Sequence, residues 1–88
     1  MGQVAVTFKI MPESPETDLE LIKNEIKQIN IKSMEIKQIK EEPIGFGLEV
    51  IKLLLLVPDT SGIANEIEEK LRKISGVKEV ETEGIGLV

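Results

Sequence analysis

The side chains that could do chemistry in this 88-residue chain are carboxylates, lysines and hydroxyls, because the sequence contains no histidine and no cysteine. Imidazole bases, thiolate nucleophiles and the commonest metal ligands are therefore excluded. Glu41 and Glu42 are neighbours on an expected strand, so their carboxylates point to opposite faces and do not converge on one substrate. The serines have no histidine to activate them: Ser14, Ser33, Ser61 and Ser75. We expect no catalytic residue, no metal and no cofactor, and hence no enzyme.

Two segments place a large apolar residue between two glycines, Gly45-Phe46-Gly47 and Gly84-Ile85-Gly86. Neither continues with the third glycine or the Lys-Ser/Thr pair of a phosphate-binding loop, so we interpret the glycines as turn or bulge residues. Phe46 is one of only two aromatic residues. Two interpretations of its ring stay open: it anchors in a pocket of a partner protein, or it folds back onto the edge of the sheet.

The charge balance argues against contact with nucleic acid. Eleven basic and sixteen acidic residues give a net charge of −5, whereas binding of DNA or RNA depends on neutralising phosphates with a basic surface. The longest apolar run is Leu53–Val57, far shorter than the roughly 20 residues of a membrane-spanning helix. We expect one cytoplasmic domain, residues 1–88, with an aliphatic core and no membrane contact.

The elements that must position these residues begin with a strand and a helix. Alternating apolar residues from Val4 to Ile10 predict a strand with one buried face, and Pro12 ends it. Thr17 or Ser14 is expected to cap the helix that follows. An apolar stripe at spacings of three and four residues predicts which side of this helix is buried: Leu19, Ile22, Ile26 and Ile29.

The next two strands are expected to flank the Gly45–Gly47 connection. Apolar residues alternate in Met34–Glu42, with a break in phase at Ile39 that predicts a bulge or a bend. Pro43 lacks an amide hydrogen and places this strand at an edge of the sheet, or ends it there. Leu48–Val57 is the most apolar stretch of the chain and predicts a central strand.

A second helix and a last strand complete the pattern. Thr60 or Ser61 is expected to begin the helix, and Gly76 to end it. Its buried stripe is again spaced for a helix: Ile63, Ile67, Leu71 and Ile74. Val77, Val80 and Ile85 then indicate a strand that Gly84 and Gly86 interrupt.

The element order β-α-β-β-α-β predicts an α+β, ferredoxin-like sandwich. Right-handed crossovers place both helices on one face of a four-stranded antiparallel sheet with the order 4-1-3-2. In this topology the Gly45–Gly47 turn lies at one end of the sheet and Leu87-Val88 at the other. Strands of about seven residues would separate these ends by roughly 20–25 Å.

The chain also resembles a known family. The segment between the second and third strands is similar to the hallmark of translation elongation factor 1-beta, and reads Glu42-Pro43-Ile44-Gly45-Phe46-Gly47-Leu48. The opening resembles the archaeal branch of that family, with Lys9-Ile10-Met11-Pro12-Glu13-Ser14-Pro15 followed by Asp18-Leu19-Glu20. Gly76-Val77-Lys78-Glu79-Val80 also fits the start of the family's last strand.

The resemblance implies a guanine-nucleotide exchange factor that promotes GDP release and GTP reloading on elongation factor 1-alpha, the GTPase that carries aminoacyl-tRNA to the ribosome. It implies that Phe46 docks in a pocket on the second domain of the GTPase, and that the end with the C-terminus approaches the switch regions and the Mg²⁺ site. The partner-binding residues are then Pro43, Ile44, Gly45, Phe46, Gly47, Leu87 and Val88. Eukaryotic members carry a lysine near the C-terminus, whereas no basic residue follows Lys78 in this chain.

Two other kinds of protein fit the same fold. A small regulatory module would bind a metabolite and dimerise through its sheet, for which the apolar run Leu53–Leu56 is suited. A binding adaptor would contact the GTPase without changing its affinity for nucleotide. An exchange factor is expected to be a monomer when free. The fold alone does not distinguish an exchange factor from a regulatory module or an adaptor. The preference for an exchange factor rests on the segment that contains Phe46.

Overall fold

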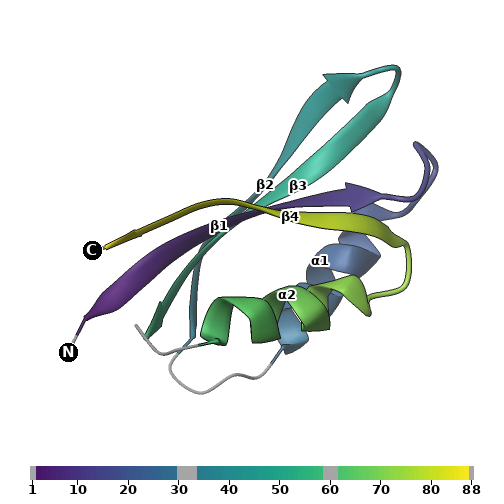
Figure 1. Ribbon diagram of the computed structural model, residues 1–88. Helices are drawn as coiled ribbons and strands as arrows, with labels where there is room; N and C mark the ends of the chain where they lie inside the picture. Colours follow the sequence, from purple (N-terminus) through teal and green to yellow (C-terminus); the bar gives the residue numbers. More distant parts are fainter. Residues whose placement is uncertain (1, 30–33, 59–61, 88) are drawn as a thin grey trace.

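The computed structural model describes residues 2–29, 34–58 and 62–87. In these residues the elements follow in the order β-α-β-β-α-β (Figure 1): β1 (Gln3–Pro12), α1 (Leu19–Gln28), β2 (Glu35–Gly45), β3 (Leu48–Pro58), α2 (Ile63–Arg72) and β4 (Val77–Leu87). The strands form one antiparallel sheet with the order β2-β3-β1-β4. This is the predicted order 4-1-3-2 read from the other edge, so the ferredoxin-like α+β fold is confirmed.

The hydrophobic core lies between one face of the sheet and the two helices. Alternate residues of β1 and β3 are opposite one another in the register and are almost fully buried, for example Phe8 opposite Leu53 and Ile10 opposite Ile51. The helices close this layer with residues one turn apart: Ile22 and Ile26 from α1, and Ile67 and Leu71 from α2. The predicted stripes are therefore correct, with their outer members only partly buried.

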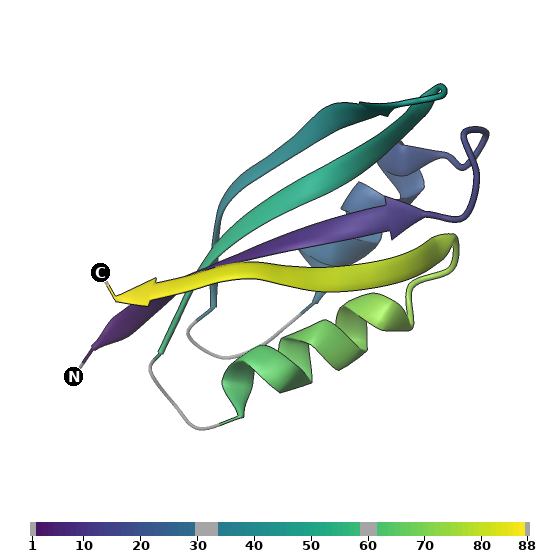
Figure 2. The ribbon, with the colours of Figure 1, turned by 45° about the horizontal axis from the view of Figure 1, so that its top comes forward.

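The helical layer is much shorter than the sheet. Each helix has ten residues, which span about 15 Å at 1.5 Å per residue. The strands have ten or eleven residues, which span roughly 33–36 Å. Strands longer than the predicted seven residues make the molecule elongated, 42 × 21 × 18 Å. Both ends of the sheet therefore extend past the helices, and Figure 2 shows the hairpin tip at one end and both termini at the other.

Local irregularities follow the sequence in part. A register shift between Ile36 and Gln38 confirms the predicted bulge in β2. Pro43 does not end this strand, which continues to Gly45 as an edge strand where a missing N–H is tolerated. Strand β4 likewise continues through Gly84 and Gly86, but a register shift opposite Thr7 and Phe8 leaves Glu83 without a register partner next to Gly84, as the bulge interpretation of this glycine predicts.

The predicted cap of the first helix is wrong. The carboxylate of Asp18 accepts a hydrogen bond from the Glu20 N–H at 3.0 Å, so Asp18 is the N-cap. Thr17 and Ser14 are instead engaged in the preceding loop, where the Ser14 N–H donates to the Thr17 hydroxyl at 3.1 Å. The expected start of the second helix at Thr60 or Ser61 lies outside the described residues, and Gly62 stands at the N-cap position.

Candidate functional site

The tip of the β2–β3 hairpin is built by three consecutive residues with positive φ: Gly45 at 103°, Phe46 at 56° and Gly47 at 76°. Glycine tolerates these values because it has no Cβ. Phenylalanine does so at a cost, and two-residue hairpin turns with positive φ at both positions normally carry Asn-Gly or Asp-Gly. The side chain of Phe46 is 100% exposed. Of the two interpretations left open, the one in which the ring folds back onto the sheet is therefore wrong.

A mainly apolar cavity of about 160 Å³, with Glu13, Ser14 and Lys78 as its polar lining residues, lies beside this tip, between the hairpin and the loop that leads from β1 to α1. Ile44, 39% exposed, and Leu48 line it from the hairpin, while Met11, Pro12 and Pro15 line it from the other side. The hairpin end thus combines a projecting ring with a shallow apolar recess. The sequence did not single out this recess, because its two walls come from segments more than 25 residues apart; the only local signal was the Pro12–Pro15 stretch.

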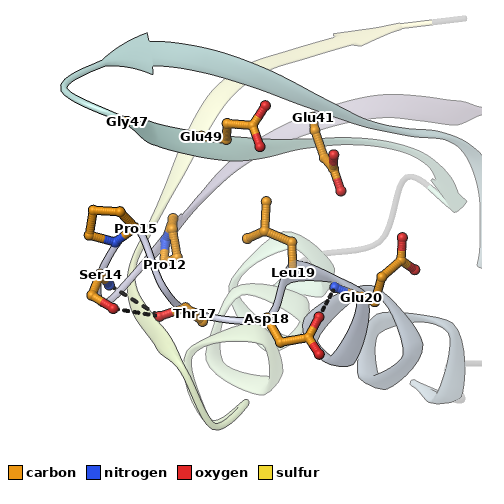
Figure 3. Close-up of a pocket in the computed structure, with 10 residues that line it drawn as sticks. All are labelled: Pro12, Ser14, Pro15, Thr17, Asp18, Leu19, Glu20, Glu41, Gly47 and Glu49. Carbon is orange, nitrogen blue, oxygen red and sulfur yellow. Dashed lines mark hydrogen bonds between the residues drawn. The ribbon is translucent and has the colours of Figure 1, made fainter.

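A second cavity, of about 240 Å³, lies on the helix side of the same end. Figure 3 shows Glu41 extending from the hairpin toward the helix side, with Glu49 beside it on the hairpin and Asp18 and Glu20 at the start of α1. This cavity is lined by four carboxylates and carries a negative charge. Within residues 2–29, 34–58 and 62–87, no group of three or more such side chains is arranged to hold a metal ion.

One lysine ties the hairpin to the helical layer at this cavity. The ammonium of Lys23 on α1 contacts Glu41 of β2 at 2.8 Å and Glu20 of its own helix at 3.0 Å. Hydrogen bonds to Glu41 and, secondly, to Glu20 raise the pKa of Lys23 above its ordinary value. The base of the projecting hairpin is therefore held by a charged contact as well as by the sheet.

The carboxy-terminal end of the sheet lies at the other extreme of the molecule. Leu87 pairs with Val4 of β1, and Val4 pairs on its other side with Val57 near the end of β3. Gly45 pairs with Leu48 at the opposite end. The predicted separation of the Gly45–Gly47 turn from the C-terminus is confirmed for Leu87, while Val88 lies outside the described residues.

The open face of the sheet is polar at its centre. Lys40, Lys52 and Lys9 stand opposite one another on three adjacent strands, and Lys52 forms an ion pair with Glu83 of β4 that raises the lysine pKa. The apolar run Leu53–Leu56 is divided between the faces, since Leu53 and Leu55 are 1% exposed in the core. Only half of the run that favoured sheet-mediated dimerisation is therefore available on the open face.

In the described part of the chain, no helix is long and apolar enough to cross a membrane.

Sequence comparison connects this architecture to one family. The profile of the EF-1 guanine nucleotide exchange domain matches residues 5–88. Proteins named elongation factor 1-beta from Methanoculleus marisnigri and Methanospirillum hungatei are 46% and 48% identical over 81 residues, which are 92% of this chain and 92% of each relative. The protein of that name from Thermoplasma acidophilum is 38% identical over 89 residues, covering both chains fully.

Solved structures share the fold at low identity. The ACT domain from GTP pyrophosphokinase of Chlorobium tepidum is 21% identical with a TM-score of 0.66, covering 91% of this chain and 97% of that one. The C-terminal domain of the MgtC protein from Mycobacterium tuberculosis is 17% identical with a TM-score of 0.59, covering 98% and 87%. These likenesses concern the fold alone. The profile match and the relatives, in contrast, span almost the whole chain, and the chain therefore belongs to the family of the EF-1 guanine nucleotide exchange domain.

Proposed function

We propose that this chain binds elongation factor 1-alpha with both ends of its sheet and thereby promotes release of GDP and reloading with GTP. The observation that carries the proposal is the conformation of Phe46. A fully exposed phenylalanine occupies a position with φ of 56°, where Asn or Asp would be less strained. The fold gains nothing from this ring, so a contact outside the molecule accounts for it best.

At the hairpin end, Phe46 is the proposed anchor. Pro43, Ile44, Gly45 and Gly47 hold it at the tip of a paired two-stranded ribbon, and the pairing limits the conformational entropy that is lost when the ring enters a pocket. Aromatic anchors of this kind supply much of the energy of protein–protein interfaces. The family resemblance names the second domain of the GTPase as the owner of that pocket.

At the carboxy-terminal end, Leu87 and Val88 are the proposed contacts with the nucleotide-binding domain. Because no basic residue follows Lys78, a lysine side chain cannot disturb the Mg²⁺ site from this position as it does in eukaryotic members. The apolar residues Leu87 and Val88 take that place in our account.

Exchange then follows from linkage. A protein that binds the nucleotide-free GTPase more tightly than the GDP-bound form lowers the affinity for GDP by the same factor. A 10³-fold effect requires about 4 kcal/mol of differential binding. No covalent step is involved, and neither a catalytic residue nor a cofactor of this chain is needed. We propose that the free protein, residues 1–88, is a monomeric cytoplasmic domain whose acidic surface does not bind nucleic acid.

The test is release of a fluorescent GDP analogue from elongation factor 1-alpha of the same organism. Acceleration at substoichiometric amounts of this protein is the expected result. Binding without acceleration would replace the exchange factor by an adaptor. Absence of both, together with dimerisation in sedimentation experiments, would favour the metabolite-binding module.

A further inference from the structure

The hydrophobic core stops short of the tip of the β2–β3 hairpin. On the core side of β3, Ile51 is fully buried, whereas the next residue on that side, Glu49, is exposed. Glu41 of β2 is the register partner of Ile51, shares its face of the sheet and is exposed too. At and beyond this level, the hairpin therefore presents carboxylates to the helical layer where the rest of the sheet presents core side chains.

Carboxylates also stand on the other side of this gap. The cavity of about 240 Å³ between the hairpin and the start of α1 is lined by Asp18 and Glu20 as well as by Glu41 and Glu49 (Figure 3). No lysine or arginine is among its described lining residues. Because like charges on two facing elements repel one another, the acidic gap would push the hairpin away from the helix unless a cation bridged it.

Lys23 of α1 is the cation that bridges the two sides. Its ammonium lies 2.8 Å from the Glu41 carboxylate of the hairpin and 3.0 Å from the Glu20 carboxylate of its own helix. The side chains of Lys23 and Glu41 are only 20% and 33% exposed. Among the ion pairs of residues 2–29, 34–58 and 62–87, this is the one that joins the hairpin to a helix.

The position of this bridge gives it leverage on the hairpin tip. Phe46 lies five residues beyond Glu41, which is roughly 17 Å along an extended strand. At that distance, a rotation of the hairpin by about 10° at Glu41 would move the tip by roughly 3 Å. The contact at the base of the hairpin therefore decides where the ring stands relative to the opposite end of the sheet.

We infer that Lys23 is a positioning residue of the exchange factor: it bridges Glu20 and Glu41, fixes the direction of the hairpin and so sets where Phe46 meets the GTPase. The inference rests on the proposed function, in which Phe46 is the anchor. Two contacts made by one body reinforce each other only when their separation fits the partner. Lys23 needs no contact with the GTPase of its own, because it acts through the hairpin.

Loss of the bridge should change the affinity for the GTPase and not the rate at saturation. In the proposed complex Phe46 docks on the second domain, so its contact is the same in the GDP-bound and nucleotide-free forms. Losing an interaction that is equal in both forms raises the half-saturating concentration and leaves the maximal rate unchanged. Lys23→Gln should therefore raise the half-saturating concentration of the factor in GDP release by roughly three- to fivefold, the size expected for one ion pair.

Matched variants control this measurement. Lys52→Gln removes an ion pair of closely similar exposure, 20% for Lys52 and 34% for Glu83, at the centre of the open face, and should match the wild type. Lys23→Arg keeps a cation between the carboxylates and should retain most of the affinity. In a Phe46→Ala background, Lys23→Gln should have no further effect, because the lysine acts through that ring. Urea unfolding confirms that each variant is folded.

The direction of the hairpin is measured separately in the free protein. The chain has no cysteine, so Gln28→Cys on α1 and Ile44→Cys on the hairpin, both at exposed positions, provide two unique sites for spin labels. Double electron–electron resonance gives the distance between the labels. Lys23→Gln should lengthen or broaden the distribution of distances, whereas Lys52→Gln should leave it unchanged.

The outcomes are distinct. An unchanged half-saturating concentration for Lys23→Gln would overturn the positioning role and leave the proposed function intact, as would unchanged label distances. An equal loss for Lys52→Gln, or a further loss in the Phe46→Ala background, would also overturn it, because the lysine would then not act through the anchor. If the wild-type protein accelerates nothing, the exchange function is wrong and the positioning role is wrong with it.

Discussion

The two ends of the sheet contain the same three-residue pattern in two different structures. At the hairpin end, Gly45 and Gly47 have positive φ and make a turn that holds Phe46 fully exposed. At the carboxy-terminal end, Gly84 and Gly86 lie within strand β4, Gly84 beside a register shift, and Ile85 is 59% exposed although its register partner Val6 is buried. Gly45 and Gly47 are needed because their φ values are positive. Gly84 and Gly86 have no positive φ, and at these two positions β4 has no side chain.

The comparison shows how one small sheet keeps two uncovered ends far apart. Ten-residue helices stabilise the middle of the sheet, and ten- or eleven-residue strands extend past them on both sides. Two ion pairs add to this arrangement, Lys23 with Glu41 at the base of the hairpin and Lys52 with Glu83 on the open face at the centre of the sheet. The central layer gives the rigidity, and the uncovered ends are free for contacts.

The largest expected effect is the loss of the hairpin anchor. Phe46→Ala should weaken binding to the nucleotide-free GTPase by about 2–4 kcal/mol, as truncation of an aromatic anchor often does. Phe46→Asn should weaken it similarly while keeping or raising the stability of the fold, because Asn-Gly suits a turn with two positive φ values. Isothermal titration gives the affinities, and unchanged affinity in either variant would contradict the anchor.

The next largest effect is a difference in the free energy of unfolding between substitutions in the two glycine pairs. Gly47→Ala introduces a Cβ at φ of 76° and should lower the free energy of unfolding by about 1–3 kcal/mol. Gly84→Ala adds a Cβ in open space without positive φ, and should leave stability unchanged or raise it by up to about 1 kcal/mol. Urea unfolding measures both. Equal destabilisation by the two substitutions would show that the ends do not differ as described.

A smaller effect concerns the helix starts. Helix α1 begins near the hairpin end with the Asp18 side chain as its cap, whereas Gly62 before α2 provides no side-chain cap. Asp18→Ala should cost about 1 kcal/mol of stability, and Asp18→Asn should retain most of it because an amide oxygen also accepts the Glu20 N–H. Thermal unfolding of the two variants would show this difference. If they lose the same amount, the cap contributes nothing.

The smallest effect is the pH dependence of the two ion pairs. Folding raises the pKa of Lys23 and of Lys52, so each pair stabilises the fold below the unfolded lysine pKa of about 10.4, and this contribution is lost as the pH rises through the folded value. Lys23→Gln and Lys52→Gln should therefore flatten the loss of stability that sets in above about pH 10. Lys23, which contacts two carboxylates, should give the larger change. An unaltered pH profile in urea unfolding would mean that the pairs are not formed in solution.

Local patterns in the sequence predicted most of the fold. Alternation in β1, the phase break at Ile39 and the helical stripes each reflect a periodicity that burial imposes directly. The cap was predicted wrongly because Ser14, Thr17 and Asp18 are all capable of capping, and the loop hydrogen bonds of Ser14 and Thr17 decide among them.

The site was less predictable than the fold. The letters Gly45-Phe46-Gly47 indicated a turn, but the exposure of the ring depends on how far the hairpin extends past the helices. The apolar recess beside it joins Met11 to Ile44 across the fold, and the ion pair of Lys23 and Glu41 joins α1 to β2. Such contacts between distant segments leave no periodic signal in the sequence.

The most direct test of the account maps the contact surface by hydrogen–deuterium exchange, with and without nucleotide-free elongation factor 1-alpha. The account predicts new protection at both ends of the sheet, in peptides covering residues 43–48 and 83–87, and unchanged exchange along the outer faces of α1 and α2. Protection at one end alone, or centred on the open face around Lys9, Lys40 and Lys52, would contradict the claim that this sheet binds its partner through two opposite ends.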